Sequence, residues 1–235
     1  QESARSLGEK MIGERLGEAK RAARSENSQA VRLSIRAGEV HPISERGVVL
    51  TDLYLSVAPG SIVGVAGVAG NGQDTLFDVL SGELPLDNPE SILLDKQPVG
   101  DLGIEARRHL GLLSAPEGRL GHAAVPDLTL WENVILSARH TRGILKNKHV
   151  ISGTQAKRFA EDIMATFDVK AESVQAKASS LSGGNLQKFL IGRELLGHPQ
   201  VFVVSNPTWG VDAKAQQFIH QALIDLADQG CAIVM

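Results

Sequence analysis

The chain has 235 residues, of which 43% are hydrophobic and 22% charged, so it is long enough to bury a sizeable core. A formal net charge of −3 argues against nucleic acid as a partner, and the single cysteine, Cys231, has no partner for an internal disulfide. No apolar run reaches the roughly 18 residues that a membrane-spanning helix needs.

The first predicted element is an amphipathic helix over residues 6–24, where apolar residues recur at near-helical spacing. A polar segment that begins at Ser25 ends it. Short β-type runs follow, with turn signals at Gly38 and at Pro59-Gly60 between them. These runs cover residues 31–35, 47–51, 53–57 and 61–65.

The next predicted elements are those of an α/β fold. Residues 75–80 start a helix directly after a glycine-rich turn, which is the strand–loop–helix order that a phosphate loop requires. The pattern from 127 to about 178 is helical, interrupted by a basic stretch at 139–149 that we interpret as a solvated loop. Strands are expected at 91–96, 110–114, 201–204 and 231–235, and helices at 182–196 and 218–227. Because the last apolar run stops with the chain, we interpret the chain as a piece of a longer polypeptide.

The glycine-rich turn at 67–74 reads Gly-Val-Ala-Gly-Asn-Gly-Gln-Asp. A phosphate loop uses glycines so that backbone N–H groups converge on the phosphates, a lysine that neutralises them, and a Ser or Thr hydroxyl that holds Mg²⁺. Gln73 stands at the lysine position and brings no charge, and Asp74 stands at the hydroxyl position and would repel phosphate. A tight turn that binds nothing therefore remains an equally good interpretation of this loop by itself.

Residues 181–188 read Leu-Ser-Gly-Gly-Asn-Leu-Gln-Lys. Ser182, Gly183 and Gly184 at a predicted helix start would offer a hydroxyl and free N–H groups to an anion. A capped helix with a Gly-Gly turn is the plainer interpretation of this motif alone. With a phosphate loop upstream the motif is much more specific, and the whole arrangement resembles an ABC-type ATPase domain.

A closer resemblance is to the second ATPase domain of tandem-domain importers for simple sugars and nucleosides. It covers about residues 45–235 and implies an α/β fold: a P-loop NTPase (RecA-like) core with an antiparallel β subdomain and an α-helical signature subdomain. Gln73 fits this family, whereas Asp74 departs from its usual Ser or Thr. The resemblance is carried by Pro116-Glu117 followed by Arg119, by Gly-Gly-Asn-x-Gln-Lys at 183–188, and by Pro207-Thr208-x-Gly210-Val211-Asp212.

The resemblance implies a division of the chain into a linker and one ATPase domain. Residues 1–29 would be the linker helix that joins a first ATPase domain to this one. Residues 30–235 would be the ABC ATPase domain, truncated at its C-terminus. Within it we expect an antiparallel β part at 30–60, a P-loop core at 61–117 and 197–235, and a helical subdomain at 118–196.

The resemblance also implies roles for single residues. Ser205 and Asn206 stand at the catalytic positions where ABC ATPases carry a Mg²⁺-organising aspartate and a catalytic glutamate, and neither can act as a general base. Asp212 matches the D-loop residue that bridges two domains. The positions that match ATP-binding residues are Gly67, Gly70, Gly72, Gln73, Asp74, Thr75 and, at the Q-loop, Glu117. The signature residues that would act in trans are Ser182, Gly183, Gly184 and Gln187.

Two further expectations concern residues outside these motifs. Trp209 stands where the family usually has Arg, and we interpret it as a partly buried aromatic that packs against the strand. We expect no metal-ligand cluster, because His122, His140 and His149 lack partners at ligand spacing.

The function that the resemblance implies is that of a nucleotide-binding domain of an importer for simple sugars or nucleosides. The partners would be an N-terminal ATPase domain of the same polypeptide, membrane permease subunits and, indirectly, a substrate-binding protein, but no nucleic acid. ATP and Mg²⁺ would be the cofactors of the assembled transporter, at the cytoplasmic face of the bacterial inner membrane. The domain by itself would be inactive as an ATPase.

Two alternatives remain open from the sequence. One is a soluble ABC protein of the DNA-repair or translation kind. The distance from Glu117 to Leu181 leaves no room for long coiled-coil arms, which argues against the repair type. The other is a non-catalytic regulatory module that only binds a nucleotide or a partner.

Overall fold

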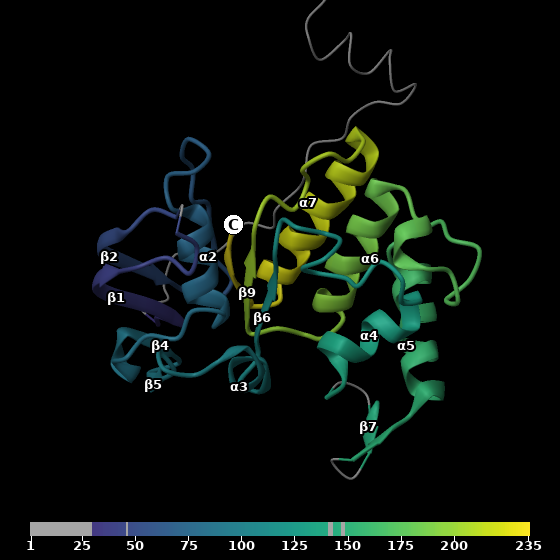
Figure 1. Ribbon diagram of the computed structural model, residues 1–235, viewed down its shortest axis with the longest axis horizontal. Helices are drawn as coiled ribbons and strands as arrows, with labels where there is room; N and C mark the ends of the chain where they lie inside the picture. The colour runs from purple at the N-terminus through teal and green to yellow at the C-terminus, as the bar shows by residue number, and fades with distance from the viewer. Residues whose placement is uncertain (1–29, 46, 141–142, 147–148) are drawn as a thin grey trace, which may run out of the picture.

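The structure is a computed structural model that describes residues 30–235 except 46, 141–142 and 147–148. Figure 1 shows an antiparallel sheet on one side, a parallel sheet in the centre and a group of helices on the other side. The helix predicted at 6–24, and with it the expected linker at 1–29, lies outside the described residues.

The antiparallel sheet has the strand order β2-β1-β4-β5. The runs predicted separately at 47–51 and 53–57 form one strand, in which Asp52 adopts a φ of 52°. Because β4 pairs with β1, and β5 pairs with β4, this sheet extends beyond the expected range of 30–60. Its strands are β1 (Leu33–Val40), β2 (Leu50–Val57), β4 (Ile92–Leu94) and β5 (Gln97–Pro98), with a short 3₁₀ helix, η1 (Pro89–Ser91), before β4.

The parallel sheet has the order β3-β10-β9-β6 and carries apolar side chains on both faces. On β9 (Val201–Val204), one of the two inner strands, Val201 and Val203 face one core. Phe202 and Val204 face the other, as expected for a strand covered on both sides. The carboxyl ends of these strands lie at one edge, where the loops that follow them meet. The strands are β3 (Ile62–Val63), β6 (Leu112–Ala115), β9 (Val201–Val204) and β10 (Ala232–Val234).

Two hydrophobic cores lie on the two faces of the parallel sheet. One fills the space between this sheet, the antiparallel sheet and helix α2 (Gln73–Ser81). The other fills the space between the parallel sheet and the helices that cover it (Figure 1). These helices are α4 (Leu130–Ala138), α5 (Gly153–Thr166), α6 (Gly183–Leu195) and α7 (Ala213–Asp228), while α3 (Ile104–His109) leads into β6.

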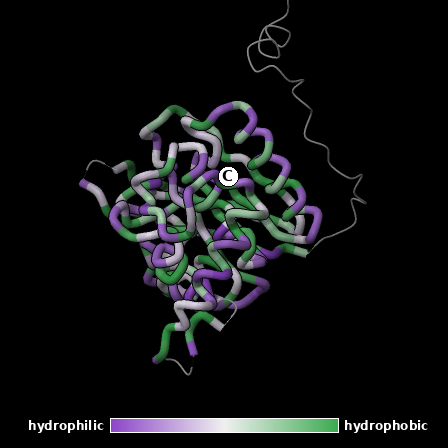
Figure 2. Tube along the Cα trace, turned by 90° about the vertical axis from the view of Figure 1, so that its right-hand side faces the viewer, coloured by the Kyte–Doolittle hydropathy of each residue, from purple (hydrophilic) through white to green (hydrophobic). Residues whose placement is uncertain are grey.

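The region predicted as helical from 127 to about 178 is only partly so. Between α4 and α5 the chain forms a hairpin of β7 (Leu145–Lys146) and β8 (Val150–Ile151), which projects from the molecule with exposed apolar residues on β8 (Figure 2). After α5, Asp168 adopts a φ of 47°, which ends the helix, and a 3₁₀ turn, η2 (Ala178–Ser180), precedes α6. Among the described residues, none of the helices combines the length and the apolar composition needed to cross a membrane.

Candidate functional site

The structure places the predicted site residues at two separate positions. One is a cavity of about 560 Å³ at the carboxyl ends of the parallel strands. Its lining includes Gln73, Asp74, Glu117, Ser205 and Asn206, which lie far apart in the sequence. The residues at 182–184 do not line this cavity; they lie at the start of α6.

The glycine-rich loop connects β3 to α2 in the predicted strand–loop–helix order. Gly72 is the residue before the helix and has a φ of 98°, a conformation that favours glycine. A Cβ at this position would lie 2.5 Å from Cδ2 of Leu50, so a larger residue would also displace that side chain. Gly70 adopts a φ of 86° as well. The loop therefore combines positive-φ glycines with a helix that starts directly after them.

The side chain of Gln73 folds back into this loop. Its Oε1 accepts a hydrogen bond from the Asn71 N–H at 3.1 Å, and its Nε2 donates to the Val68 carbonyl at 3.1 Å. A Cβ on Gly67 would lie 2.5 Å from that Nε2, so the amide packs directly against the glycine backbone. Gln73 thus satisfies groups of its own loop, where a lysine would present a cation.

The charges at the cavity are unfavourable for a triphosphate. Asp74 and Glu117 contribute carboxylates, and none of the residues that line the cavity is Lys, Arg or His. On the same helix, burial raises the pKa of Asp78, and the neighbouring carboxylates Glu83 and Asp74 raise it further. The cavity lining therefore carries two carboxylates and no compensating cation, which disfavours phosphate groups.

The residues at the cavity do not fit a complex of Mg²⁺ with ATP. The loop lacks its lysine, and Ser205 supplies a neutral hydroxyl where a carboxylate would organise the metal. Thr75 is buried, and its hydroxyl donates to the Val48 carbonyl at 3.1 Å. The Thr75 hydroxyl is thus engaged within the fold, and ATP binding by Thr75 stays a prediction.

The turn after β9 closes the other side of the cavity. Asn206 has a φ of 44°, which Asn tolerates better than most residues, and its Nδ2 donates to Oε2 of Glu117 at 2.6 Å. The turn carries Trp209 outwards, so that its side chain is 69% exposed at the rim of the cavity. The interpretation of Trp209 as a partly buried aromatic was therefore wrong.

The start of α6 presents hydrogen-bond donors at the surface, in contrast to the carboxylates of the cavity. Ser182 is the N-cap of the helix, and its Oγ accepts hydrogen bonds from the backbone N–H of Asn185 at 3.4 Å and from its Nδ2 at 2.9 Å. Both Ser182 and Gly183 are exposed. The first N–H groups of a helix have no partner within it and carry the positive end of the helix dipole, so this surface favours an anion.

Two side chains flank the glycines at this helix start. A Cβ on Gly183 would lie 2.5 Å from Nη1 of Arg119, and one on Gly184 would lie 3.2 Å from Oδ2 of Asp212. Arg119 also donates to the Trp209 carbonyl. The two glycines therefore allow a cation and a carboxylate to approach the backbone closely. Sequence reasoning gave Arg119 no role, and the Pro-Glu-x-Arg motif was the only signal for it.

Buried polar contacts hold α6 in place. Gln187 is buried, and its Nε2 donates to the Pro207 carbonyl at 2.9 Å, so its side chain holds the loop after β9. This position differs from the expectation that Gln187 faces a partner domain. Farther along α6, the buried Glu194 accepts from Arg108 at 2.6 Å and from Arg193 at 2.8 Å. Burial alone would raise the pKa of Glu194, but the two guanidinium groups outweigh it and hold the pKa below its usual range.

One group of possible metal ligands lies outside both positions. Ligand atoms of Glu105, His109 and His140 all lie within 4.8 Å of one another. The expectation that His140 lacks partners was therefore wrong. The spacing of ligands in the sequence did not reveal this group, because Glu105 and His109 lie on α3 whereas His140 follows α4.

Comparison with known families and proteins gives a consistent result. The family model described as ABC transporter matches residues 50–209. The chain is 33% identical over 184 residues to the guanosine import ATP-binding protein NupO of Bacillus subtilis, covering 78% of the chain and 36% of that protein. It is 34% identical over 199 residues to the ribose import ATP-binding protein RbsA 1 of Rubrobacter xylanophilus, covering 84% of the chain and 39% of that protein. The chain thus spans little more than a third of the length of these relatives.

Solved structures show the same fold. The ATP-binding cassette MJ0796, in a dimeric post-hydrolysis state bound to ADP and Pi, superimposes with a TM-score of 0.68 at 21% identity and covers 86% of each chain. A nucleotide-free ATP-binding cassette from an ABC transporter gives a TM-score of 0.63 at 20% identity, over 87% of this chain and 80% of that one. The predicted fold class is confirmed by these likenesses.

Proposed function

Because the chain belongs to the ABC transporter family, we propose that it is a nucleotide-binding domain of an importer for simple sugars or nucleosides. In this assembly it presents Ser182, Gly183 and Gly184 to an ATP held by a second ATPase domain. Its own phosphate loop forms a site that does not hydrolyse ATP. Relatives named for the import of guanosine and of ribose support the substrate class.

The observation that carries this proposal is the contrast between the two positions. The start of α6 exposes N–H groups and a hydroxyl beside the guanidinium of Arg119. The phosphate-loop cavity offers carboxylates and no basic side chain. A domain with this pattern can contribute to ATP chemistry through its signature surface and not through its own loop.

The partners and location follow from the same proposal. The second ATPase domain precedes this one in the same polypeptide, and residues 1–29 join it to the domain at 30–235. Membrane permease subunits bind the pair, a substrate-binding protein acts through them, and the assembly lies at the cytoplasmic face of the inner membrane. ATP and Mg²⁺ belong to the competent site of the assembled transporter. The greater length of the relatives supports this arrangement.

The chemical role of this chain at the competent site is to bind and orient. The Ser182 hydroxyl and the N–H groups of Gly183 and Gly184 donate hydrogen bonds to phosphate oxygens. Because Gln187 and Glu194 fix α6 from within, these donors keep their positions as charge develops on the phosphate. Pre-organised donors of this kind stabilise a transition state without reorganisation.

The test compares single changes in the full-length transporter. Gly183→Asp places a carboxylate against the phosphate and should lower ATPase activity at least about tenfold, while Gln73→Ala should lower it by no more than about threefold. Gly38→Asp is the matched control, because Gly38 is exposed and a Cβ there meets no atom within 4 Å. If Gln73→Ala abolishes activity and Gly183→Asp is silent, the proposal is wrong.

A further inference from the structure

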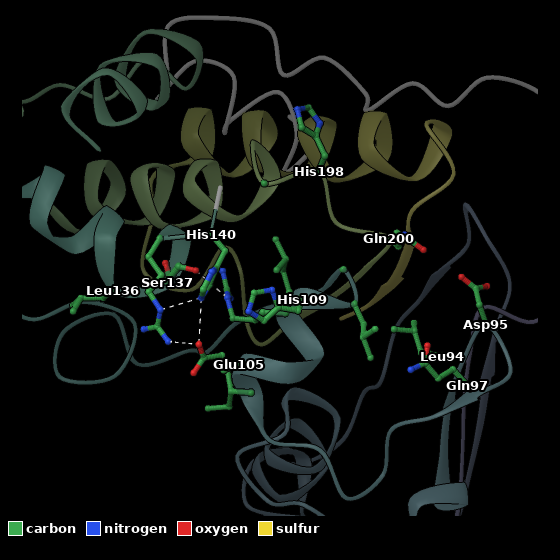
Figure 3. Close-up of a pocket in the computed structure, with 17 residues that line it drawn as sticks. Leu94, Asp95, Gln97, Glu105, His109, Leu136, Ser137, His140, His198 and Gln200 are labelled. Atoms are coloured by element: carbon green, nitrogen blue, oxygen red, sulfur yellow. Dashed lines mark hydrogen bonds and ion pairs between the residues drawn. The ribbon is translucent and has the colours of Figure 1, made fainter. Parts of the chain in front are cut away.

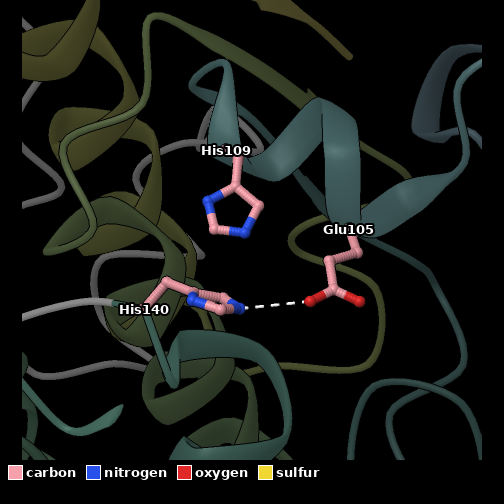
Figure 4. A group of neighbouring side chains, drawn as sticks. All are labelled: Glu105, His109 and His140. Carbon is pink, nitrogen blue, oxygen red and sulfur yellow. Dashed lines mark hydrogen bonds and ion pairs between the residues drawn. The ribbon is translucent and has the colours of Figure 1, made fainter. Parts of the chain in front are cut away.

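A second cavity, of about 710 Å³, lies between α3 and the end of α4, beside the amino ends of β6 and β9 (Figure 3). Glu105 and His109 are four residues apart on α3, which places them on one face of the helix. His140 follows α4 and faces them across the cavity (Figure 4). The centroids of the two imidazole rings are 4.1 Å apart. The cavity therefore gathers two imidazoles and a carboxylate at one point.

At His140, one ring nitrogen lies close to both a donor and an acceptor. Its Nε2 lies 3.1 Å from Nε of Arg139 and 3.2 Å from Oε1 of Glu105. The guanidinium can only donate, so toward Arg139 the ring nitrogen must accept. A carboxylate can only accept, so toward Glu105 the same nitrogen would have to donate. One nitrogen atom cannot satisfy both contacts.

A metal ion between His140 and Glu105 would take the place of the Arg139 guanidinium, which donates to both of them. In the tautomer that accepts from Arg139, the Nε2 lone pair and the Glu105 oxygen are two acceptors at 3.2 Å. Two ligands of a tetrahedral ion with bonds of about 2.0 Å are separated by about 3.3 Å. The observed spacing therefore suits a shared metal ion, and a ligand atom of His109 lies within 4.8 Å of both of these ligands.

Arg139 already supplies a positive charge at this place. Its Nη2 lies 2.6 Å from Oε1 of Glu105, and its side chain is 37% exposed. Because it lies at the surface, it can swing away when a stronger cation binds the carboxylate. Arg139 is therefore a competitor of a metal ion for the same oxygen.

From this geometry we propose that Glu105, His109 and His140 bind one divalent transition-metal ion of the class that takes imidazole and carboxylate ligands, such as Zn²⁺. The three ligands are exposed, which leaves a fourth position for water. The ion clamps α3 to the end of α4. Since α3 leads into β6, and β6 ends just before Glu117, the clamp connects the end of α4 with the strand that reaches the cavity lined by Gln73 and Glu117.

The first experiment titrates metal-free chain with zinc sulfate by calorimetry. One ion should bind per chain with a micromolar dissociation constant, and His109→Ala and His140→Ala should each weaken binding at least about tenfold. His41→Ala is the matched control. His41 lies 3.2 Å from Glu39 in an exposed pair, but it belongs to no three-ligand group among the described residues. Equal binding to all of these variants would overturn the proposal.

The second experiment uses the competitor. Arg139→Gln should tighten zinc binding several-fold, because the guanidinium no longer occupies the carboxylate. At a hundredfold excess of zinc over the dissociation constant, the melting temperature of the native chain should rise by on the order of 5 °C, and that of His140→Ala by no more than about half as much. Failure of the native chain to bind overturns the proposal. Binding by Arg139→Gln alone also overturns it, since Arg139 would then hold the site shut.

Discussion

The phosphate-loop cavity and the start of α6 both have the backbone of an anion site, but they differ in charge. At the cavity, Asp74 and Glu117 face the space where phosphates would lie, and the Gln73 amide is bound within its own loop. At α6, the exposed donors of Ser182 and Gly183 lie beside the guanidinium of Arg119, while the Asp212 carboxylate lies against Gly184. Glycine geometry alone therefore does not define a phosphate site; the neighbouring side chains decide its sign.

The two regions also differ in how they are anchored. The helix α6 is held along its length by Gln187 and by the buried group of Glu194 with Arg108 and Arg193. The phosphate loop is held by a backbone hydrogen bond from Asn71 to Val68 at 3.2 Å and by two exposed hydrogen bonds of Gln73. A rigid helix start is what presentation to a neighbouring domain requires, because a loose donor would have to be ordered at the moment of reaction.

The largest predicted effect concerns the rate of ATP hydrolysis by the chain alone. We expect a rate at least about 10³-fold below that of a cassette with a complete site, because the loop lysine and both strand carboxylates are missing. Phosphate release by purified chain measures it, with Ser205→Ala as the background control. A rate typical of ABC cassettes that Ser205→Ala abolishes would contradict the assignment.

A smaller effect concerns nucleotide binding at the loop. The native chain should bind ATP with a millimolar dissociation constant, equivalent to about −4 kcal/mol. The double change Gln73→Lys with Asp74→Ser should tighten binding at least about tenfold, or ~1.4 kcal/mol, because it adds a cation and removes a repelling carboxylate. Calorimetry measures both constants.

The control for this prediction comes from the other region. Gly183→Asp should leave ATP binding to the isolated chain unchanged, because Gly183 does not line the cavity. Micromolar binding to the native chain would show that the cavity accepts phosphate despite its charges, and the comparison would fail.

The smallest effect separates two roles of Ser182. Ser182→Ala should lower the free energy of unfolding by about 1 kcal/mol, because α6 loses its N-cap. Ser182→Asp keeps a good N-cap and should leave stability within about 0.5 kcal/mol. In the full-length transporter, however, its carboxylate should reduce ATPase activity as Gly183→Asp does. Urea unfolding and ATPase assays test the pair, and full activity of Ser182→Asp would remove Ser182 from the proposed contact.

Local sequence patterns predicted the elements that carry both positions. The order strand, glycine loop, helix is written in consecutive residues, and so are the N-cap Ser182 and the apolar run of β9. The helical pattern across 127–178 was misleading where the chain forms the β7–β8 hairpin. A short hairpin has too few residues to establish a period of two against its helical neighbours.

The sequence by itself determined which charges are missing. Folding cannot supply the lysine that Gln73 replaces or the carboxylate that Asn206 replaces. The sequence also determined the capped start of α6, since capping depends on neighbours a few residues away. Only the tertiary structure decided that Gln187 is buried and that Trp209 is exposed. It alone brought Glu105, His109 and His140 together. These outcomes depend on which elements pack side by side, and contacts between distant segments leave no periodic signal in one sequence.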